Sequence, residues 1–132
     1  MIRDLENGEG SKPCRNVLGG HLQPCSFAPT TGFFRDGHCH TCSQDHGSHT
    51  VCAVMSTEFL AFSKAAGNDL LTPHPQFDFP GLKPGDRWCL CAGRWLEACE
   101  AGKAPQVVLE STNEAALEIV PLELLEKHAA TA

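Results

Sequence analysis

The strongest constraint in this sequence is a dense group of cysteine and histidine residues near its middle. Fifteen consecutive residues, 38–52, contain seven side chains that can ligate a metal: His38, Cys39, His40, Cys42, His46, His49 and Cys52. The chain of 132 residues has eight Cys and seven His in all. Such a chain must bury its thiols, pair them, use them in chemistry or bind a metal with them, and each outcome restricts how the surrounding loops fold.

Length and composition indicate one globular domain. Domains most often have about 100 to 150 residues, and 42% hydrophobic and 20% charged residues are ordinary values for a folded protein. Residues 1–13 are polar and predict a mobile N-terminal arm, which leaves residues 14–132 as the single globular domain. A formal net charge of −6 without a basic stripe argues against nucleic acid as a partner.

The N-terminal sequence and the hydropathy predict a cytoplasmic protein. The first ten residues carry four charged side chains and no apolar run, unlike an export signal. No stretch approaches the roughly 20 apolar residues that cross a bilayer, so no membrane span is expected. Thiols in the cytoplasm stay mostly reduced. In an oxidising compartment the eight Cys would permit many disulfide pairings, and the sequence does not choose among them.

The apolar periodicity predicts a small α+β (mixed α/β) domain. Residues 14–48 are rich in Gly and Pro, which predicts a loop-rich N-terminal half. Apolar runs predict one central sheet with strands near residues 51–55, 87–92 and 106–110. Helices packed on this sheet are expected near residues 57–64, 92–101, 114–120 and 122–130. Because helices follow strands, some parallel pairing is also expected.

The spacing of the thiols and imidazoles predicts a possible zinc site. Cys39 and Cys42 have the separation of a zinc half-site, and His49 with Cys52 can supply the other half. Zinc is the natural ion for mixed thiolate and imidazole ligands. The alternative interpretation is a histidine-rich loop with small buried cysteines.

A thiol-dependent enzyme, whether a hydrolase, a transferase or a redox protein, is the second class of function. His49 can serve as the base for Cys52 or Cys39 as nucleophile. A redox role for Cys39 and Cys42 requires a thiol with a lowered pKa. We expect the His49 ring near Cys39 or Cys52, with one nitrogen held by a carboxylate such as Asp45 or by a backbone carbonyl.

Two further cysteines lie on the predicted strand at residues 87–92. Residues i and i+2 of a strand point to the same face, so Cys89 and Cys91 share one face. There they form part of the core or line a pocket with Cys25, Cys39 or Cys52.

Three segments of the chain resemble an uncharacterised, mainly bacterial family, the domain of unknown function 2237. They are NVLGGHLQPCS…TGFFRDGHC (16–39), GSHTVCAVMSTEFLAFSKAAGNDLLTP (47–73) and FPGLKPGDRWCLCAGRW (79–95). The residues that match the family pattern around the ligand-rich segment are Cys39, Thr41, Asp45, Gly47, His49 and Cys52. Cys42 stands where the family usually has Gly, so a mechanism that needs Cys42 is not the family's shared mechanism. The resemblance implies no activity, because the family has none assigned.

Overall fold

A three-stranded sheet with helices on one side forms the centre of the molecule. The structure, a computed structural model, describes residues 14–130, so the arm predicted for residues 1–13 lies outside the described residues. The strand order is β3-β2-β4, with bounds β2 (His49–Val54), β3 (Arg87–Cys91) and β4 (Gln106–Val107). The predicted α+β class is confirmed, and the three apolar runs do share one sheet.

Both strand pairs of the sheet are antiparallel, so the expectation of parallel pairing between neighbouring strands is wrong. The chain that leaves β2 returns beside its exit point, where Met55 N–H donates to Asp86 O at 2.7 Å and Gly85 N–H donates to Met55 O at 2.9 Å. β3 therefore starts next to the end of β2 and must run the opposite way. β3 and β4 point in the same direction, but β2 lies between them.

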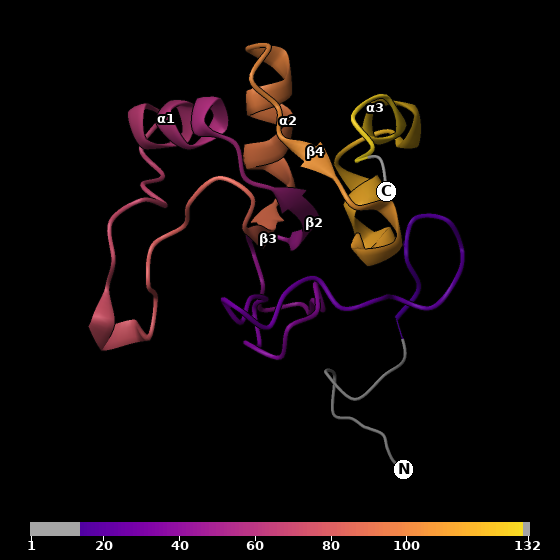
Figure 1. The fold of residues 1–132 in the computed structure, drawn as a ribbon. Helices are drawn as coiled ribbons and strands as arrows, with labels where there is room; N and C mark the ends of the chain where they lie inside the picture. Colours follow the sequence, from indigo (N-terminus) through magenta and orange to yellow (C-terminus); the bar gives the residue numbers. More distant parts are fainter. Residues whose placement is uncertain (1–13, 131–132) are drawn as a thin grey trace.

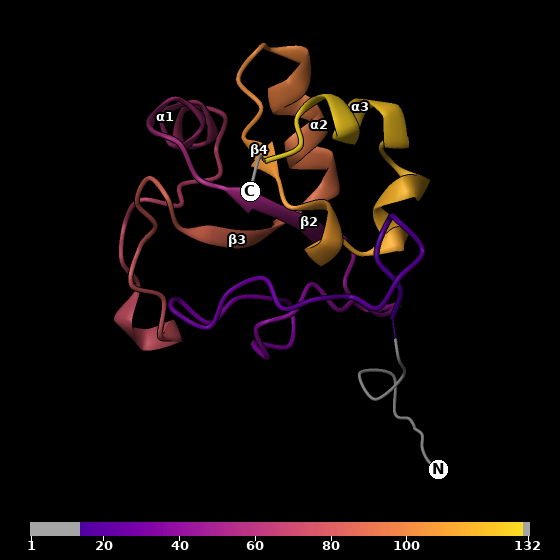
Figure 2. The same ribbon diagram turned by 45° about the vertical axis from the view of Figure 1, so that its right-hand side comes forward.

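The three α-helices lie on one side of the sheet and residues 14–48 lie on the other (Figures 1 and 2). Their bounds are α1 (Thr57–Ala65), α2 (Ala92–Glu100) and α3 (Leu122–Lys127). Ser56 caps α1 by accepting a hydrogen bond from Phe59 N–H at 3.1 Å. Among residues 14–130, no helix combines the length and apolar character that crossing a membrane requires.

The C-terminal third is less regular than its periodicity predicts. The strand expected over residues 106–110 ends at Val107 and continues as a 3-10 turn, Leu109–Ser111. The helix expected over residues 114–120 is a 3-10 helix, Glu114–Glu118, whose first turn is capped by Asn113. These elements are shorter than the periodicity predicts because their packing on the sheet overrides the intrinsic helix and strand propensities of their residues.

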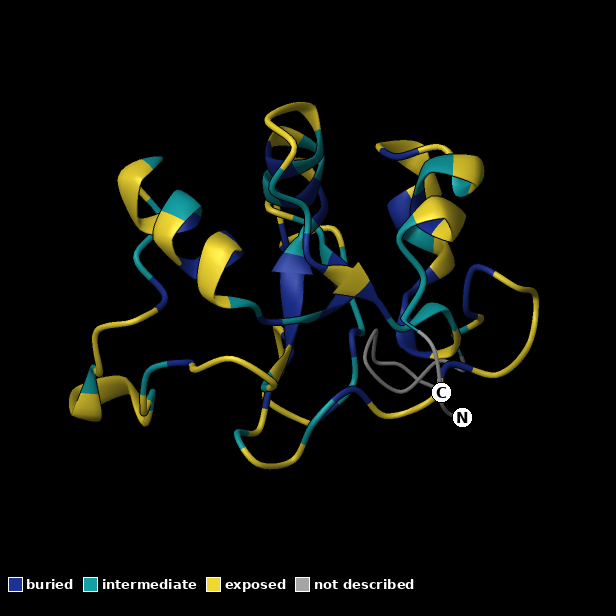
Figure 3. Cartoon of the chain, turned by 45° about the horizontal axis from the view of Figure 1, so that its top comes forward, coloured by how far each residue is buried: buried dark blue, intermediate teal, exposed yellow. Residues whose placement is uncertain are grey.

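The two faces of the sheet bury different chemistry. Val51 and Leu90 are register partners in the apolar core shared with the helices. Cys52 and Cys89, the next pair along the ladder, belong to a separate cluster of buried cysteines. β2 is buried along most of its length (Figure 3). The cysteines that point from β2 and β3 into this cluster are therefore on the sheet face that residues 14–48 cover.

Candidate functional site

A bulge in β2 places His49 on the same face of the sheet as the cysteines. His49 and Cys52 are three residues apart, so strict alternation would put them on opposite faces. The register shifts between His49 and Val51, and His49 pairs with Cys91 while Cys52 pairs with Cys89. Such an extra residue reorients a side chain. The bulge thus aligns the His49 imidazole with the Cys91 thiol.

His49 bridges a carboxylate and a thiol. Its Nδ1 lies 2.6 Å from Asp45 Oδ1, and its Nε2 lies 3.2 Å from Cys91 Sγ. The other carboxylate oxygen, Asp45 Oδ2, accepts hydrogen bonds from His49 N–H and Thr41 Oγ1, each at 2.9 Å. Asp45, His49 and Cys91 therefore form a chain of carboxylate, imidazole and thiol with a fixed ring orientation. The predicted carboxylate partner of His49 is confirmed.

The electrostatics favour a protonated His49 ring. The hydrogen bond to Cys91 raises the pKa of His49 to about 9; burial opposes this rise, and Asp45 adds to it. Burial acts to raise the pKa of Asp45, but hydrogen bonds from the His49 backbone, the His49 ring and Thr41 hold it below its ordinary value. The Asp45 side chain is 0% exposed and that of His49 is 36% exposed. In its protonated form the ring donates from both nitrogens, to the carboxylate and to the sulfur.

Cys91 lies where β3 passes directly into α2. It is the N-cap residue of α2, and its side chain makes no capping hydrogen bond. Cys91 therefore combines a position at the start of a helix with a sulfur 3.2 Å from His49 Nε2. The sulfur also borders an open groove of about 490 Å³. The residues that line the groove are His46, Gly47, Cys91, Gly93, Arg94, Glu97 and Ile119.

Gly47 permits the close approach of this thiol and imidazole. A Cβ at position 47 would lie 3.1 Å from both Cys91 Sγ and His49 Cε1. Contacts this short force the neighbouring side chains to move. An alanine at this position would therefore displace the thiol or the imidazole by a few tenths of an ångström.

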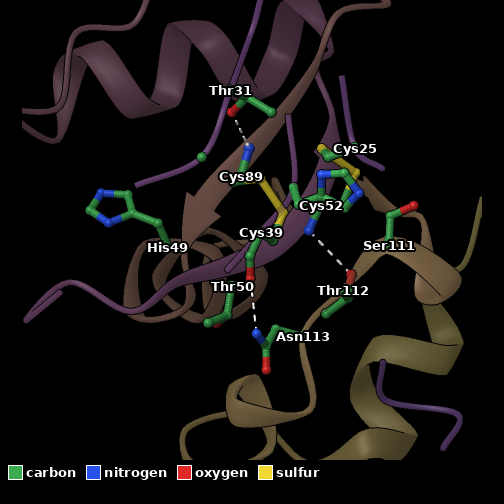
Figure 4. Close-up of a disulfide and its surroundings, with 12 residues drawn as sticks. Cys25, Thr31, Cys39, His49, Thr50, Cys52, Cys89, Ser111, Thr112 and Asn113 are labelled. Carbon is green, nitrogen blue, oxygen red and sulfur yellow. Dashed lines mark hydrogen bonds between the residues drawn. A yellow bond between two sulfur atoms is a disulfide. The ribbon is translucent and has the colours of Figure 1, made fainter. Parts of the chain in front are cut away.

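Four other cysteines form two buried disulfides on the same sheet face. Cys25 pairs with Cys52 and Cys39 with Cys89, with Cα atoms 5.8 and 5.3 Å apart. Both bridges attach loop residues to strands, Cys25 to β2 and Cys39 to β3 (Figure 4). The ligand atoms of Cys25, Cys39 and Cys89 lie within 4.8 Å of one another, a grouping that could hold a metal ion.

The four predicted zinc ligands occupy three different surroundings. Cys39 and Cys52 are in separate disulfides, His49 contacts Cys91, and Cys42 is half-buried outside the disulfides. Among residues 14–130, the grouping compatible with a metal shares only Cys39 with the predicted set. Residues distant in sequence, Cys25 and Cys89, complete it, and local spacing does not reveal them.

The cysteine partner of His49 differs from the expected one. The sequence predicts Cys39 or Cys52, but both sulfurs are bonded to other cysteines, and the ring reaches Cys91 instead. One sequence feature could have identified Cys91: it lies between a predicted strand and a predicted helix, where a thiol meets a helix N-terminus.

Comparison with known families gives a match over residues 15–129 to the family described as "Uncharacterized protein conserved in bacteria (DUF2237)". A search among curated proteins finds no match.

Proposed function

The chain belongs to DUF2237, a family of uncharacterised proteins conserved in bacteria, and we propose that it is a cysteine-dependent hydrolase or acyltransferase with Cys91 as nucleophile. The observation that carries this proposal is the His49 ring held between Asp45 and Cys91 at 2.6 and 3.2 Å. A nucleophile, a base and a group that orients the base are the parts such chemistry needs. The partner of Cys91 is an imidazole and not a second thiol, which favours acyl transfer over disulfide chemistry.

The proposed reaction begins from a Cys91 thiolate and a His49 imidazolium. The thiolate forms a bond to the carbonyl carbon of an ester, thioester or amide, and the carbonyl oxygen takes the negative charge. First-turn N–H groups of a helix have no intrahelical partner. That of Ala92 donates to Ser48 O at 3.0 Å, so those of Gly93 and Arg94 are the donors proposed for this oxygen. The bond to the leaving group then breaks as His49 Nε2 protonates that group.

The second half of the reaction regenerates the ion pair. Neutral His49 accepts a proton from water or from an acceptor alcohol, amine or thiol, whose oxygen, nitrogen or sulfur attacks the acyl-enzyme. The bond from carbon to Cys91 Sγ breaks, and the thiolate returns to its place beside the protonated ring. Asp45 keeps the ring in position throughout and stabilises its charge, so it is a positioning residue.

Brief alkylation with iodoacetamide at neutral pH tests this proposal. Cys91 should be modified at least ~10-fold faster than Cys42, since both lie outside the disulfides and only Cys91 has a histidinium partner. An activated ester should also leave an acyl group on Cys91, visible by mass spectrometry, and Cys91→Ser should abolish both results. Equal alkylation rates at Cys91 and Cys42, with no acylation, would contradict the proposal.

A pair of glycine variants separates this geometry from general stability. Gly47→Ala should slow Cys91 alkylation because its Cβ meets both Cys91 and His49 at 3.1 Å. Gly20→Ala is the matched control, since its nearest neighbour would be an Asn16 side-chain atom at 3.7 Å, an ordinary contact.

A second proposed role is zinc binding by the buried cysteines of the reduced protein. Its support is the proximity of the Cys25, Cys39 and Cys89 sulfurs, within 4.8 Å of one another, together with the preference of zinc for thiolates. The three come from two loop positions and one strand. A bound ion would therefore connect distant parts of the chain, as structural zinc sites do.

Metal analysis of untagged, fully reduced protein tests the zinc role. We expect one zinc per chain. Cys39→Ser should lower both the metal content and the thermal stability, because binding energy at such a site is largely folding energy. Cys42→Ser and His49→Gln should retain the metal, which distinguishes this cluster from the set predicted by spacing. Reduced protein that stays metal-free in excess zinc would contradict the role.

A further inference from the structure

We infer that Cys52 is the fourth ligand of the zinc site, and that zinc and the two disulfides are alternative states of the same four sulfurs. This inference rests on the zinc role proposed above and deepens it. The four residues are Cys25, Cys39, Cys52 and Cys89, which form one cluster and are between 0% and 4% exposed.

The choice of Cys52 follows from the pairing of the strands. Cys52 is the register partner of Cys89 and is bonded to Cys25. It belongs to the same buried cluster as the three grouped cysteines, although its sulfur is outside the group within 4.8 Å. Cys91, the other candidate on β3, has its sulfur hydrogen-bonded by His49 at 3.2 Å and borders the open groove. Of these two, only Cys52 is enclosed with the cluster.

A tetrathiolate site requires the four clustered sulfurs to separate from their disulfide partners and close on one ion. Four thiolates around zinc, with bonds of about 2.3 Å, have sulfurs roughly 3.8 Å apart. Three of these sulfurs lie within 4.8 Å of one another. On reduction the two bonded pairs must separate to roughly 3.8 Å for the four thiolates to close on an ion. Side-chain rotation on fixed strands and loops can provide such shifts.

A buried hydroxyl is available to a thiolate in this cluster. Thr31 is 0% exposed and accepts a hydrogen bond from Cys89 N–H at 2.8 Å. Within residues 14–130, no acceptor is found for the hydroxyl proton of Thr31. Hydrogen bonds from such neighbours stabilise metal-bound thiolates.

Both states would hold the loop of residues 25–39 against β2 and β3. The disulfides attach its two ends, Cys25 and Cys39, to Cys52 and Cys89, and one zinc would join the same four residues. This loop carries Phe33, whose ring stacks against His49 with centroids 6.2 Å apart. Exchange of the two disulfides for one zinc ion would therefore preserve the surroundings of His49 in reducing and oxidising conditions alike.

Conversion of the zinc-bound state into the disulfide state removes four electrons from the four thiolates. With a peroxide as oxidant, one zinc tetrathiolate, two hydrogen peroxide and four protons give two disulfides, one free Zn²⁺ and four water. Each disulfide forms from two thiolates, and each peroxide is reduced to two water molecules. The ion leaves because a disulfide sulfur is a poor zinc ligand, whereas the thiolate is the form that binds.

Peroxide titration of the reduced, zinc-loaded full-length chain tests the inference. Released zinc is followed with a chromophoric chelator, and remaining thiols are counted by mass after alkylation with N-ethylmaleimide. We expect one zinc released as two disulfides form, with Cys25–Cys52 and Cys39–Cys89 identified by peptide mapping. Cobalt(II) substituted for zinc should show the visible bands of four-sulfur tetrahedral coordination, which Cys52→Ser should change and Cys42→Ser should not.

The outcomes separate the inference from the zinc role itself. Reduced wild-type protein that binds neither zinc nor cobalt would overturn both. Stoichiometric binding that persists after both disulfides have formed would overturn only the inference. A cobalt spectrum of folded Cys52→Ser that equals the wild-type spectrum would likewise overturn only the inference. If Cys52→Ser does not fold, the oxidation of the wild-type chain decides alone.

Discussion

Replacing His49 with Gln should lower the alkylation rate of Cys91 near pH 6 by on the order of 100-fold, because an ordinary thiol ionises only near pH 8.5. In the proposed mechanism the protonated ring, 3.2 Å from the sulfur, is the cation that favours the reactive form of this thiol. Glutamine keeps a hydrogen-bonding side chain but carries no charge. The two rates should converge above about pH 9, where an ordinary thiol is ionised without help.

The pH dependence of stability gives this prediction a second readout. The pKa of His49 is raised to about 9 in the folded protein, above the value of about 6.5 expected in the unfolded chain. A histidine whose pKa is higher in the folded protein stabilises the fold fully when the pH is below its pKa in the unfolded chain. This stabilisation is lost as the pH rises through its pKa in the folded protein. The stability difference between the wild type and His49→Gln should therefore shrink between about pH 6.5 and 9.

A second cysteine and histidine pair provides the control. Cys99 Sγ lies 3.6 Å from His128 Nε2, but this histidine has no carboxylate partner comparable to Asp45 among residues 14–130. His128→Gln should leave the alkylation profile of Cys91 unchanged. If His49→Gln and His128→Gln have the same small effect, His49 does not activate Cys91.

Removing the Cys39–Cys89 bridge should destabilise the oxidised protein by about 4 kcal/mol. The bridge spans 50 residues, and loss of loop-closure entropy in the unfolded chain gives about this value for such a span. The double variant Cys39→Ala with Cys89→Ala leaves no buried hydroxyl behind and no unpaired thiol. Since small domains have only about 5 to 15 kcal/mol of stability, this loss should lower the unfolding midpoint of the variant strongly.

Urea unfolding under oxidising conditions measures this loss. The double variant Cys25→Ala with Cys52→Ala should lower the free energy of unfolding slightly less, by about 3.6 kcal/mol, because that bridge spans 27 residues. Cys42→Ala is the control and should change the midpoint little, since Cys42 lies outside both disulfides. A Cys39/Cys89 variant that unfolds at the wild-type midpoint would show that this bridge does not hold the native fold.

The local sequence determined the elements of the sheet and its helices. Val51 to Met55 and Trp88 to Cys91 are continuous apolar runs, and such runs bounded by turn residues are typical of buried strands. Ser56 ends one run with a capping hydroxyl, and Gly67, with φ of 97°, follows the helix. These signals depend on neighbouring residues alone, so one sequence suffices to read them.

The direction of the strands required the tertiary structure. An intervening helix suggested parallel pairing, but the proline-rich connection of residues 68–85 returns the chain to the end of β2, where Met55 and Asp86 join. This connection contains one short 3-10 helix, Pro75–Phe77, and its direction cannot be assigned from sequence rules. Where it ends is decided by packing against the rest of the domain.

The sequence by itself determined which side chains carry chemistry here, and only the tertiary structure decided which of them meet. Asp45 and His49 are four residues apart and form a local contact, which the sequence anticipates. Cys91 lies 42 residues beyond His49, and the pairing depends on a bulge that turns His49 to the cysteine face. Eight thiols of one residue type are chemically equivalent in a sequence; they become disulfide partners, metal ligands or nucleophiles only through the backbone positions that the strand register gives them.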